Sequence, residues 1–241
     1  MIYKENVKIG LKDIEKQNYL GNKAILEYLE NIAGHHADSL GYGLNTMNET
    51  GLTWVLLEWH VNIIKRIQYG QNLTLCTWSR SIERCYGNRD FEIYDENNEL
   101  CVIASSKWLL IDIKKGSIAK ADNEMIKKYD SECDKAVFEN EKFDKIDIPK
   151  EFKSNFVYKI KRKDIDVIGH MHNIYYLDLA YEALPEEIYE KRIFDNIRIT
   201  YKKEIKYGEV VNCKYAFINN KHIIVIENEE GNIIHAVIEL Y

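Results

Sequence analysis

An internal repeat constrains this sequence more than any other feature. Three segments of the first half recur in the second half in the same order, and the matches include Tyr-Leu and Tyr-Gly pairs and a polar turn between apolar runs. The matched segments are 21–30 with 169–178, 60–70 with 198–208, and 94–100 with 227–233. Chance similarity between two β-rich segments is the alternative, but the shared order favours one unit of about 120 residues written twice.

Each copy is predicted to contain a short strand, one helix and several longer strands, which is an α+β architecture. Residues 24–33 are apolar nearly all round, as in a buried helix. We expect a second helix from about 173 to 183, and strands near 53–67, 72–86, 89–94, 100–112, 155–160, 194–206, 209–218, 221–227 and 232–240. Two such sheets can join edge to edge and protect two exposed edges.

The same patterns predict the domain boundaries. The first copy is expected over 1–113 and the second over 153–241. The intervening segment 114–152 is rich in Lys, Asp and Glu, so we expect a linker that runs over the surface.

Charge, hydropathy and cysteine content exclude several classes of protein. The net charge of -6 does not suggest a nucleic-acid partner, which would need a concentrated basic face, although lysine-rich patches exist locally. No apolar run approaches the roughly 20 residues of a membrane span, and the N-terminus lacks a signal-peptide pattern. The five cysteines lack a C-x-x-C pair and lie mostly in apolar segments, which predicts buried free thiols in a reducing cytoplasm. A catalytic cysteine is the alternative.

The candidate catalytic residues lie in the second copy. Asp166 and His170 flank Gly169 in a loop before the predicted helix, where unpaired backbone amides can support an oxyanion. The imidazole can shuttle a proton, and a carboxylate can orient it or activate water. Glu204, on a predicted strand, is a second carboxylate that could project toward the helix start and act as a base. The alternatives are a helix cap with a surface histidine, and a solvated surface over 202–204.

The repeat makes this group asymmetric. In the alignment above, the first copy has Asn18 and Asn22 in the columns of Asp166 and His170, and Arg66 in the column of Glu204. Only the second copy therefore carries a carboxylate and histidine group.

These residues carry a family resemblance. Segment 164–176, D-I-D-V-I-G-H-M-H-N-I-Y-Y, resembles the D-L-D-x-N-x-H-V-N-N-x-x-Y motif of acyl-acyl carrier protein (acyl-ACP) thioesterases, and segment 201–204, Y-K-K-E, resembles their Y-R-R-E motif. Further landmarks in the first copy resemble W-V, W-G-D, T-W and W-x-x-M-D of that family: Trp54-Val55, Tyr69-Gly70, Thr77-Trp78 and Lys107–Asp112. The resemblance spans nearly the whole chain and implies a tandem, or double, hotdog fold.

By position, the resemblance implies that Asp166, His170 and Glu204 form the catalytic group. Water would attack the thioester carbonyl with help from carboxylate and imidazole, without a covalent serine intermediate and without cofactor or metal. Ile168 stands where the family motif has asparagine, and its side chain cannot donate a hydrogen bond. That role would pass to other groups, namely the backbone amides of Gly169 or His170, or the side chains of His172 or Asn173.

The implied function is hydrolysis of acyl-ACP to free fatty acid in fatty acid biosynthesis. The predicted helix of the first copy, with Trp54, Leu56 and Trp59, could line an acyl tunnel, although core packing would explain the same residues. A basic surface would dock the acidic carrier protein, unless it is only a solvated face. Its residues are Lys161, Arg162, Lys163, Lys202, Lys203 and Lys206.

Two other functions and two oligomeric states stay open. An acyl-coenzyme A thioesterase could use the same fold, and a non-catalytic acyl-binding protein could retain it after activity faded. The internal repeat already supplies the pairing of two copies, so a monomer can be complete, and a homodimer is the alternative.

Overall fold

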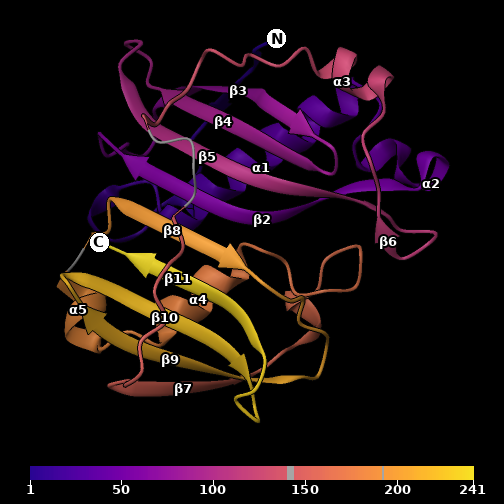
Figure 1. The fold of residues 1–241 in the computed structure, drawn as a ribbon. Helices are drawn as coiled ribbons and strands as arrows, with labels where there is room; N and C mark the ends of the chain where they lie inside the picture. The colour runs from indigo at the N-terminus through magenta and orange to yellow at the C-terminus, as the bar shows by residue number, and fades with distance from the viewer. Residues whose placement is uncertain (140–143, 192) are drawn as a thin grey trace. The chain divides into compact units, whose positions relative to one another are not determined.

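The computed structural model describes residues 1–139, 144–191 and 193–241. The chain divides into two compact units, Met1–Lys142 and Phe143–Tyr241. Each unit contains one copy of the repeat. In each, an antiparallel sheet accompanies one principal helix, as predicted (Figure 1).

Unit 1 is built on five long strands in the order β1-β3-β4-β5-β2, all antiparallel. Their bounds are β1 Tyr3–Lys8, β2 Leu52–Ile63, β3 Asn72–Glu83, β4 Tyr86–Tyr94 and β5 Leu100–Asp112, with β6 Ser117–Ile118 paired to β5. The helices are α1 Asn22–Ser39, α2 Met47–Thr50 and α3 Asn123–Tyr129, with 3-10 helices at Leu11–Asp13, Lys16–Asn18 and Leu44–Thr46. Most of the apolar residues expected in α1 are buried, which supports a core helix, but Tyr28 is only half-buried.

Unit 2 repeats this plan with five strands in the order β8-β11-β10-β9-β7. Their bounds are β7 Ser154–Lys159, β8 Asn196–Tyr201, β9 Val210–Ile218, β10 Lys221–Asn228 and β11 Ile234–Leu240. The helices are α4 Tyr175–Glu182 and α5 Glu186–Lys191, with a 3-10 helix at Arg162–Asp164. The strand predicted to reach residue 206 ends at Tyr201, so Glu204 lies beyond the strand.

Backbone hydrogen bonds correct the first block of the repeat alignment by three residues. Glu15 N donates to Tyr19 O at 2.9 Å, and Asp166 N donates to His170 O at 2.8 Å, so Glu15 and Tyr19 are the true counterparts of Asp166 and His170. Asn18 instead matches Gly169, and both have positive φ, 64° and 93°. Identities at a few positions were too sparse to reveal this shift, whereas hydrogen-bond register fixes it.

The second block keeps its predicted register. Leu20 N donates to Ile67 O at 2.7 Å in the first copy, and Met171 N donates to Ile205 O at 2.8 Å in the second. Because Ile67 and Ile205 are counterparts, Arg66 is confirmed as the counterpart of Glu204.

A bulge in β2 explains how residues of uneven spacing share the core. The pairing of β2 with β5 shifts between Leu56 and Glu58, so that one residue is skipped. Side chains alternate along a strand, and a bulge reverses that alternation. Leu56 and Trp59 are therefore both buried, although three positions separate them.

The segment 114–152 is more structured than a surface linker. Met125 and Tyr129 of α3 are buried with Leu110 in a hydrophobic cluster of unit 1. Trp78 Nε1 also donates to Lys135 O at 2.9 Å. This part of the segment therefore packs into unit 1 rather than running over the surface.

Only part of the cysteine prediction is confirmed. All five cysteines are free thiols, but only Cys76, Cys101 and Cys213 are buried, whereas Cys133 is exposed and Cys85 is half-buried. Within the described ranges, no helix combines the length and apolar character needed to cross a membrane.

Candidate active site

A buried aspartate anchors the turn that carries the candidate residues. Asp164 Oδ2 accepts hydrogen bonds from Lys161 N at 2.8 Å and from the Tyr158 hydroxyl at 2.9 Å. Its counterpart Asp13 does the same for Gly10 N at 2.9 Å and the Tyr28 hydroxyl at 2.8 Å. Because both copies share this anchor, Asp164 supports the fold of the turn.

Asp166 organises the turn itself. Its Oδ1 accepts hydrogen bonds from the backbone amides of Ile168, Gly169 and His170 at 2.8, 3.0 and 3.1 Å. The amides of Gly169 and His170 were expected to replace the family's asparagine as donors to substrate. The structure contradicts that expectation, because Asp166 already uses both amides.

Backbone pairing brings the second carboxylate segment to this turn. His170 forms an antiparallel bridge with Lys206, next to the hydrogen bond from Met171 N to Ile205 O. Glu204 therefore lies one residue before a segment that is paired directly with the His170 turn. The structure thus brings all three predicted catalytic residues to one region of unit 2.

The pKa of Tyr176, a buried tyrosine on α4, responds to the charges of Glu204 and Asp166. Burial raises the pKa of Tyr176 well above its usual value, and the negative charges of Glu204 and Asp166 raise it further. A backbone hydrogen bond from Ile205 acts in the opposite direction. Tyr176 therefore keeps its proton.

The candidate groups are accessible. His170 and Asp166 are half-buried and Glu204 is exposed. Within the described part of the chain, the imidazole of His170 and the carboxylate of Glu204 form no hydrogen bond or ion pair with another side chain. Ile168 is 42% exposed, so it stands at the rim of the turn rather than in a core.

The first copy indicates where the side chain at the column of Glu204 can reach. Arg66 Nη1 donates to Asn22 Oδ1 at 2.7 Å, and Asn22 is the first residue of α1. By the corrected register, the counterparts of this pair are Glu204 and Asn173. A side chain at this column can thus reach the helix start, which supports the predicted direction of Glu204.

Comparison with known proteins decides the family. The model of the acyl-ACP thioesterase N-terminal domain matches residues 1–129, and that of the C-terminal domain matches residues 148–240. The chain belongs to the acyl-ACP thioesterase family. Both halves of the sequence carry the match, in the order that the repeat predicts.

Relatives of this acyl-ACP thioesterase family member include plant proteins. The chain is 24% identical over 226 residues to oleoyl-acyl carrier protein thioesterase 1 of Arabidopsis thaliana, covering 87% of this chain and 62% of the relative. It is 23% identical over 203 residues to a dodecanoyl-[acyl-carrier-protein] hydrolase of Cinnamomum camphora, covering 78% and 52%. The chain thus spans about three fifths of the length of the first of these relatives.

Solved structures establish the fold of the family member. An acyl-ACP thioesterase from Bacteroides thetaiotaomicron matches with a TM-score of 0.88 and 20% identity, covering 99% of this chain and 96% of that one. The 12:0-ACP thioesterase from Umbellularia californica matches with a TM-score of 0.85 and 16% identity, covering 99% and 96%. The fold is the double hotdog that the resemblance implies.

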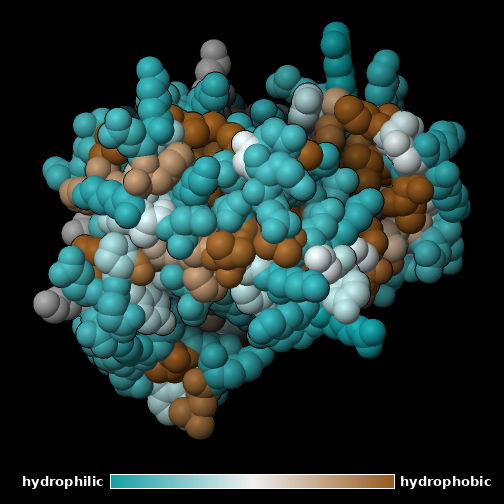
Figure 2. Space-filling view, turned by 90° about the horizontal axis from the view of Figure 1, so that it is seen from below, coloured by the Kyte–Doolittle hydropathy of each residue, from teal (hydrophilic) through white to brown (hydrophobic). Residues whose placement is uncertain are grey.

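In this member of the acyl-ACP thioesterase family, the predicted docking residues form an unneutralised basic surface. Arg162 lies 5.7 Å from the ring of Tyr207, which follows Lys206, so the contact joins the basic segments 161–163 and 202–206. All six cations are exposed, and within the described ranges none forms an ion pair. Arg198, by contrast, is paired: its Nη1 lies 3.2 Å from a carboxylate oxygen of Glu239. In Figure 2, hydrophilic side chains cover much of the face drawn, with hydrophobic side chains spread among them.

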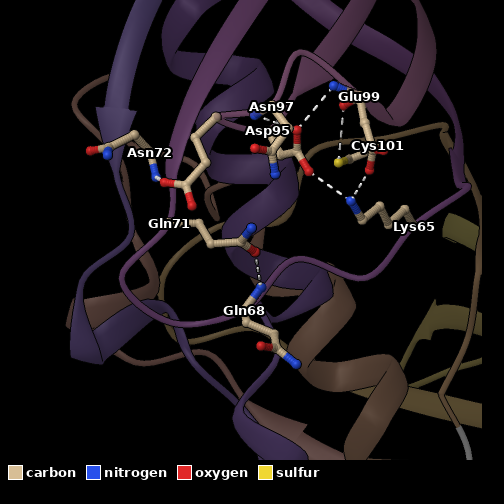
Figure 3. Close-up of polar contacts among 9 residues, drawn as sticks. Lys65, Gln68, Gln71, Asn72, Asp95, Asn97, Glu99 and Cys101 are labelled. Atoms are coloured by element: carbon tan, nitrogen blue, oxygen red, sulfur yellow. Dashed lines mark hydrogen bonds and ion pairs between the residues drawn. The ribbon is translucent and has the colours of Figure 1, made fainter.

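The first copy neutralises a cation that the second copy leaves unpaired. Lys65 Nζ lies 2.7 Å from Asp95 Oδ2 and also contacts the Glu99 carboxylate (Figure 3). These contacts raise the pKa of Lys65, and the hydrogen bond from Lys65 is the main cause that lowers the pKa of Asp95. By the register of the repeat, the counterparts are Lys203 and Asn228.

Asn228 preserves the turn without the charge of Asp95. Its Oδ1 accepts hydrogen bonds from the amides of Asn232 at 3.1 Å and Ile233 at 2.9 Å. Asp95 Oδ1 likewise accepts from Asn97 and Glu99, both at 2.9 Å. The second copy therefore keeps a side-chain acceptor in this hairpin, which is one residue longer, and lacks the carboxylate that would neutralise Lys203.

The predicted acyl-binding residues lie within the hydrophobic interior of unit 1. Trp59 is buried against Phe91, with ring centroids 5.2 Å apart, and Leu56 is also buried. Trp54 is half-buried and donates to the Tyr129 hydroxyl at 3.0 Å. Each has ordinary packing partners, so their role toward substrate stays a prediction.

His172 and Asn173 lie at the start of α4 in unit 2. The ring of His172 lies edge-on to Tyr175 at 6.0 Å, and Asn173 O accepts a hydrogen bond from the Tyr201 hydroxyl at 3.0 Å. Both residues therefore follow the catalytic turn directly in sequence, and the His172 side chain and the Asn173 backbone each contact a tyrosine.

Proposed function

We propose that this protein hydrolyses fatty acyl-ACP to a free fatty acid and carrier protein in fatty acid biosynthesis. The observation that carries the proposal is the backbone pairing that holds the turn of Asp166 and His170 against the segment of Glu204. Membership of the acyl-ACP thioesterase family supports the same activity.

Glu204 is the proposed general base. Its exposed carboxylate takes a proton from the water that attacks the thioester carbonyl, and a carbon–oxygen bond forms as the carbon–sulfur bond breaks. His170 donates a proton to the departing thiolate. Transfer of the proton from Glu204 to His170 then restores both groups, so that the net reaction consumes one water.

Asp166 has a positioning role in this proposal. Its Oδ1 accepts three backbone amides of the turn, including that of His170. This network fixes the backbone that presents the imidazole.

We propose that the six exposed cations around the site dock the carrier protein. The absence of carboxylate partners for them within the described residues supports this role, because an acidic partner would then supply the missing counter-charges.

The free thiol state of all five cysteines supports a cytoplasmic location. Size measurement in solution would distinguish a monomer from a homodimer.

We also keep the division of labour that the sequence predicts. The first copy, 1–113, would bind the acyl chain with Trp54, Leu56 and Trp59, and the second, 153–241, would perform the chemistry. His172 and Asn173 would contact the thioester end of the substrate. Substitution of Leu56 by Trp should then shorten the preferred acyl chain without abolishing hydrolysis.

The decisive experiment measures thiol release from acyl-ACP by the purified protein and by Glu204→Gln and His170→Ala. We expect wild-type turnover and a loss of at least about a hundredfold in kcat for each variant, the usual scale of acid–base catalysis. The thermal stability of both should stay close to wild type, because neither side chain has a hydrogen-bond partner within the described residues. Full activity in Glu204→Gln would refute the proposed base.

The two alternatives have separate outcomes in the same assay. Faster turnover of acyl-coenzyme A than of acyl-ACP with the same acyl chain would favour the coenzyme A thioesterase. Binding of acyl chains without thiol release from either substrate would favour the non-catalytic protein. Ile168, in place of the family's asparagine, is the feature that keeps the second alternative open.

A further inference from the structure

Two consecutive apolar side chains are exposed on the turn that carries the candidate catalytic residues. Val167 is 78% exposed and Ile168 is 42% exposed. We call this pair the apolar tip. Neither side chain takes part in the proposed acid–base chemistry. Single exposed apolar residues are ordinary on protein surfaces, so the role of this pair depends on what surrounds it.

The first copy shows that the turn does not need an apolar tip in order to form. By the corrected register, Lys16 and Gln17 are the counterparts of Val167 and Ile168, and both are exposed. Matching backbone hydrogen bonds close the two turns. Val167 and Ile168 therefore expose apolar surface to water at positions where the first copy has polar residues, and this exposure brings the fold no benefit.

Hydrogen bonds hold the backbone of the apolar tip in place. Asp166 Oδ1 accepts the amides of Ile168, Gly169 and His170 at 2.8, 3.0 and 3.1 Å. His170 is also bridged to Lys206 on the neighbouring segment. A surface that is already ordered loses little conformational entropy when a partner covers it. The tip is thus preformed for contact.

The basic surface described above adjoins the same turn. Segment 161–163 precedes the turn in sequence, and Lys206 is bridged to its last part. Arg162 lies 5.7 Å from the exposed ring of Tyr207, which adds an aromatic side chain to this region. Apolar contacts combined with a charged, solvated rim are typical of protein–protein interfaces. The turn and its neighbours provide both components.

We infer that the apolar tip is a docking contact for the acyl carrier protein, in which Val167 and Ile168 are buried against an apolar side chain of the carrier while the neighbouring cations face its acidic groups. This inference rests on the proposed function, since it assigns a contact within the docking step. The thioester is attached to the carrier, so the carrier must be held beside the catalytic turn during hydrolysis. Ile168, which stands in place of the asparagine of the family motif, then serves binding.

The test measures the Kd of a purified acyl carrier protein for the full-length chain and for the double variant Val167→Ser with Ile168→Gln. Both substitutions remove apolar surface without changing charge, and both retain the backbone amides of the turn. We expect Kd to rise roughly tenfold, because apolar contacts buried in an interface contribute strongly to affinity. Val167→Ser alone should raise Kd less. An unchanged Kd in the double variant, or no carrier binding by the wild type, would overturn the inference.

Ile218→Gln is the matched control in unit 2. Ile218 is 43% exposed, close to the value for Ile168, and it is the last residue of β9. The strand spans roughly 27 Å from Val210, the residue that follows the loop after Lys206. Ile218→Gln should therefore leave Kd unchanged. A rise equal to that of Ile168→Gln would overturn the inference, since loss of any exposed apolar side chain would then have the same effect.

Salt separates the apolar tip from the cations. Ions in solution screen charged contacts but not apolar ones. The ratio of Kd between the double variant and wild type should therefore stay near tenfold at two ionic strengths, although both values rise with salt. Disappearance of the difference at the higher ionic strength would contradict an apolar contact.

Kinetics show which part of the substrate the tip contacts. A pantetheine thioester of the same acyl chain has the reacting bond but no protein surface. The ratio of kcat/KM for acyl-ACP to kcat/KM for this thioester should fall about tenfold in the double variant. Equal losses for both substrates would place the contact at the thioester end and overturn the inference.

Binding and turnover distinguish failure of this inference from failure of the proposed function. If the wild type binds the carrier but releases no thiol from acyl-ACP, the proposed function fails, and the Kd values still decide the docking contact. If the wild type is active and the double variant keeps its Kd, the docking inference alone fails. Binding to phosphatidylglycerol vesicles that the double variant loses, with unchanged carrier binding, would assign the tip to a lipid surface and overturn the inference.

Discussion

Two aspartates of the catalytic turn differ in their partners although they are only two positions apart. Asp164 is buried and bonds a tyrosine hydroxyl and a backbone amide, whereas Asp166 is half-buried and bonds three successive amides. The first aspartate has an identical counterpart in Asp13, and the second has Glu15 in its place. The shared residue therefore belongs to the fold, and the unshared residue belongs to the site.

Substitution of these aspartates should separate stability from activity. Asp164→Ala should lower the free energy of unfolding by about 1–3 kcal/mol, because the Tyr158 hydroxyl and the Lys161 amide lose their acceptor. Asp13→Ala, the matched variant, should cost a similar amount. Chemical denaturation measures both. Equal stability of Asp164→Ala and wild type would contradict the assigned anchor.

Asp166 should respond differently to the loss of its charge and to the loss of its oxygen. Asp166→Asn keeps an acceptor for the turn and should retain the melting temperature, whereas Asp166→Ala should lower it. Both should reduce kcat, since the carboxylate charge near His170 disappears in each. Thiol-release kinetics and thermal melting on the same samples check this. Wild-type kcat in both variants would remove Asp166 from the mechanism.

His36 predicts how stability responds to acid. Burial lowers the pKa of His36 to about 3, and the nearby Arg89 guanidinium, 3.0 Å from Nδ1, lowers it further. In the unfolded chain, His36 therefore binds a proton near pH 6.5, whereas in the folded chain it stays neutral at that pH. Stability should therefore be complete above pH 6.5 and fall toward pH 3, by up to about 1.4 kcal/mol per pH unit. Urea unfolding from pH 7 to 4 measures the slope, which should decrease in His36→Gln.

At the residue scale, motif spacing predicted Asp166, His170 and Glu204 but not their supports. Tyr176 was part of the quoted motif, yet its edge-on contact with Tyr201 depends on how α4 packs. His235, whose ring Nδ1 lies 3.1 Å from the carbonyl oxygen of Lys203, gave no signal, because it lies in an apolar strand where periodicity predicts only burial. Such partners come from distant segments, so sequence spacing does not contain them.

At the scale of the element, the turn 165–171 depends on one glycine. Gly169 has a φ of 93°, and an added Cβ would meet no atom within 4 Å. Space does not prevent substitution, so only the backbone conformation does. The first copy solves the same problem with Asn18, whose φ is 64°.

Asn18, the counterpart of Gly169 in the first copy, suggests a test by substitution. Gly169→Ala should destabilise the protein by about 1–2 kcal/mol, the cost of a left-handed conformation for a residue with a Cβ. Gly169→Asn should cost less, because asparagine tolerates this conformation. Thermal melting ranks the variants, and a ranking with alanine above asparagine would contradict the argument.

Some bounds of the strands could be predicted from sequence patterns, and others could not. The strands from 72 to 112 lie close to their predicted bounds because alternation and β-branched residues mark them directly. The end of β8 was missed, since Ile197, Ile199, Tyr201 and Ile205 all lie at odd-numbered positions, and this spacing continues past the last residue of the strand. The first repeat block was misaligned because Gly21 and Gly169 match in type but not in hydrogen-bond register.

At the scale of the whole molecule, charge is distributed unevenly over a chain with a net charge of -6. Exposed cations without partners within the described residues gather beside the candidate site, in 161–163 and 202–206. An excess of local positive charge on an acidic protein favours an acidic partner and speeds its association.

Reversing charge at this surface should weaken the carrier substrate selectively. The double variant Lys161→Glu with Lys163→Glu should raise KM for acyl-ACP roughly tenfold with little change in kcat, since both side chains are exposed and outside the proposed chemistry. Added salt should reduce the difference between variant and wild type. Steady-state kinetics at two ionic strengths measures both effects.

Lys150→Glu is the matched control for that experiment. Lys150 precedes β7, whereas the basic surface begins beyond the other end of this strand, and six residues in extended conformation separate the two by about 20 Å. Lys150→Glu changes the net charge by the same amount as each of the two substitutions in the double variant. An equal rise in KM for Lys150→Glu would show that net charge, and not the surface, controls binding.

The corrected repeat has a consequence for how such a protein can change. When two identical chains pair, every mutation occurs twice, and each half inherits what the other half needs. Here Arg66 and Glu204, or Lys16 and Val167, occupy matching places but are encoded separately. Each copy is free to change without its sister, while Asp13 and Asp164 preserve the frame that both still require.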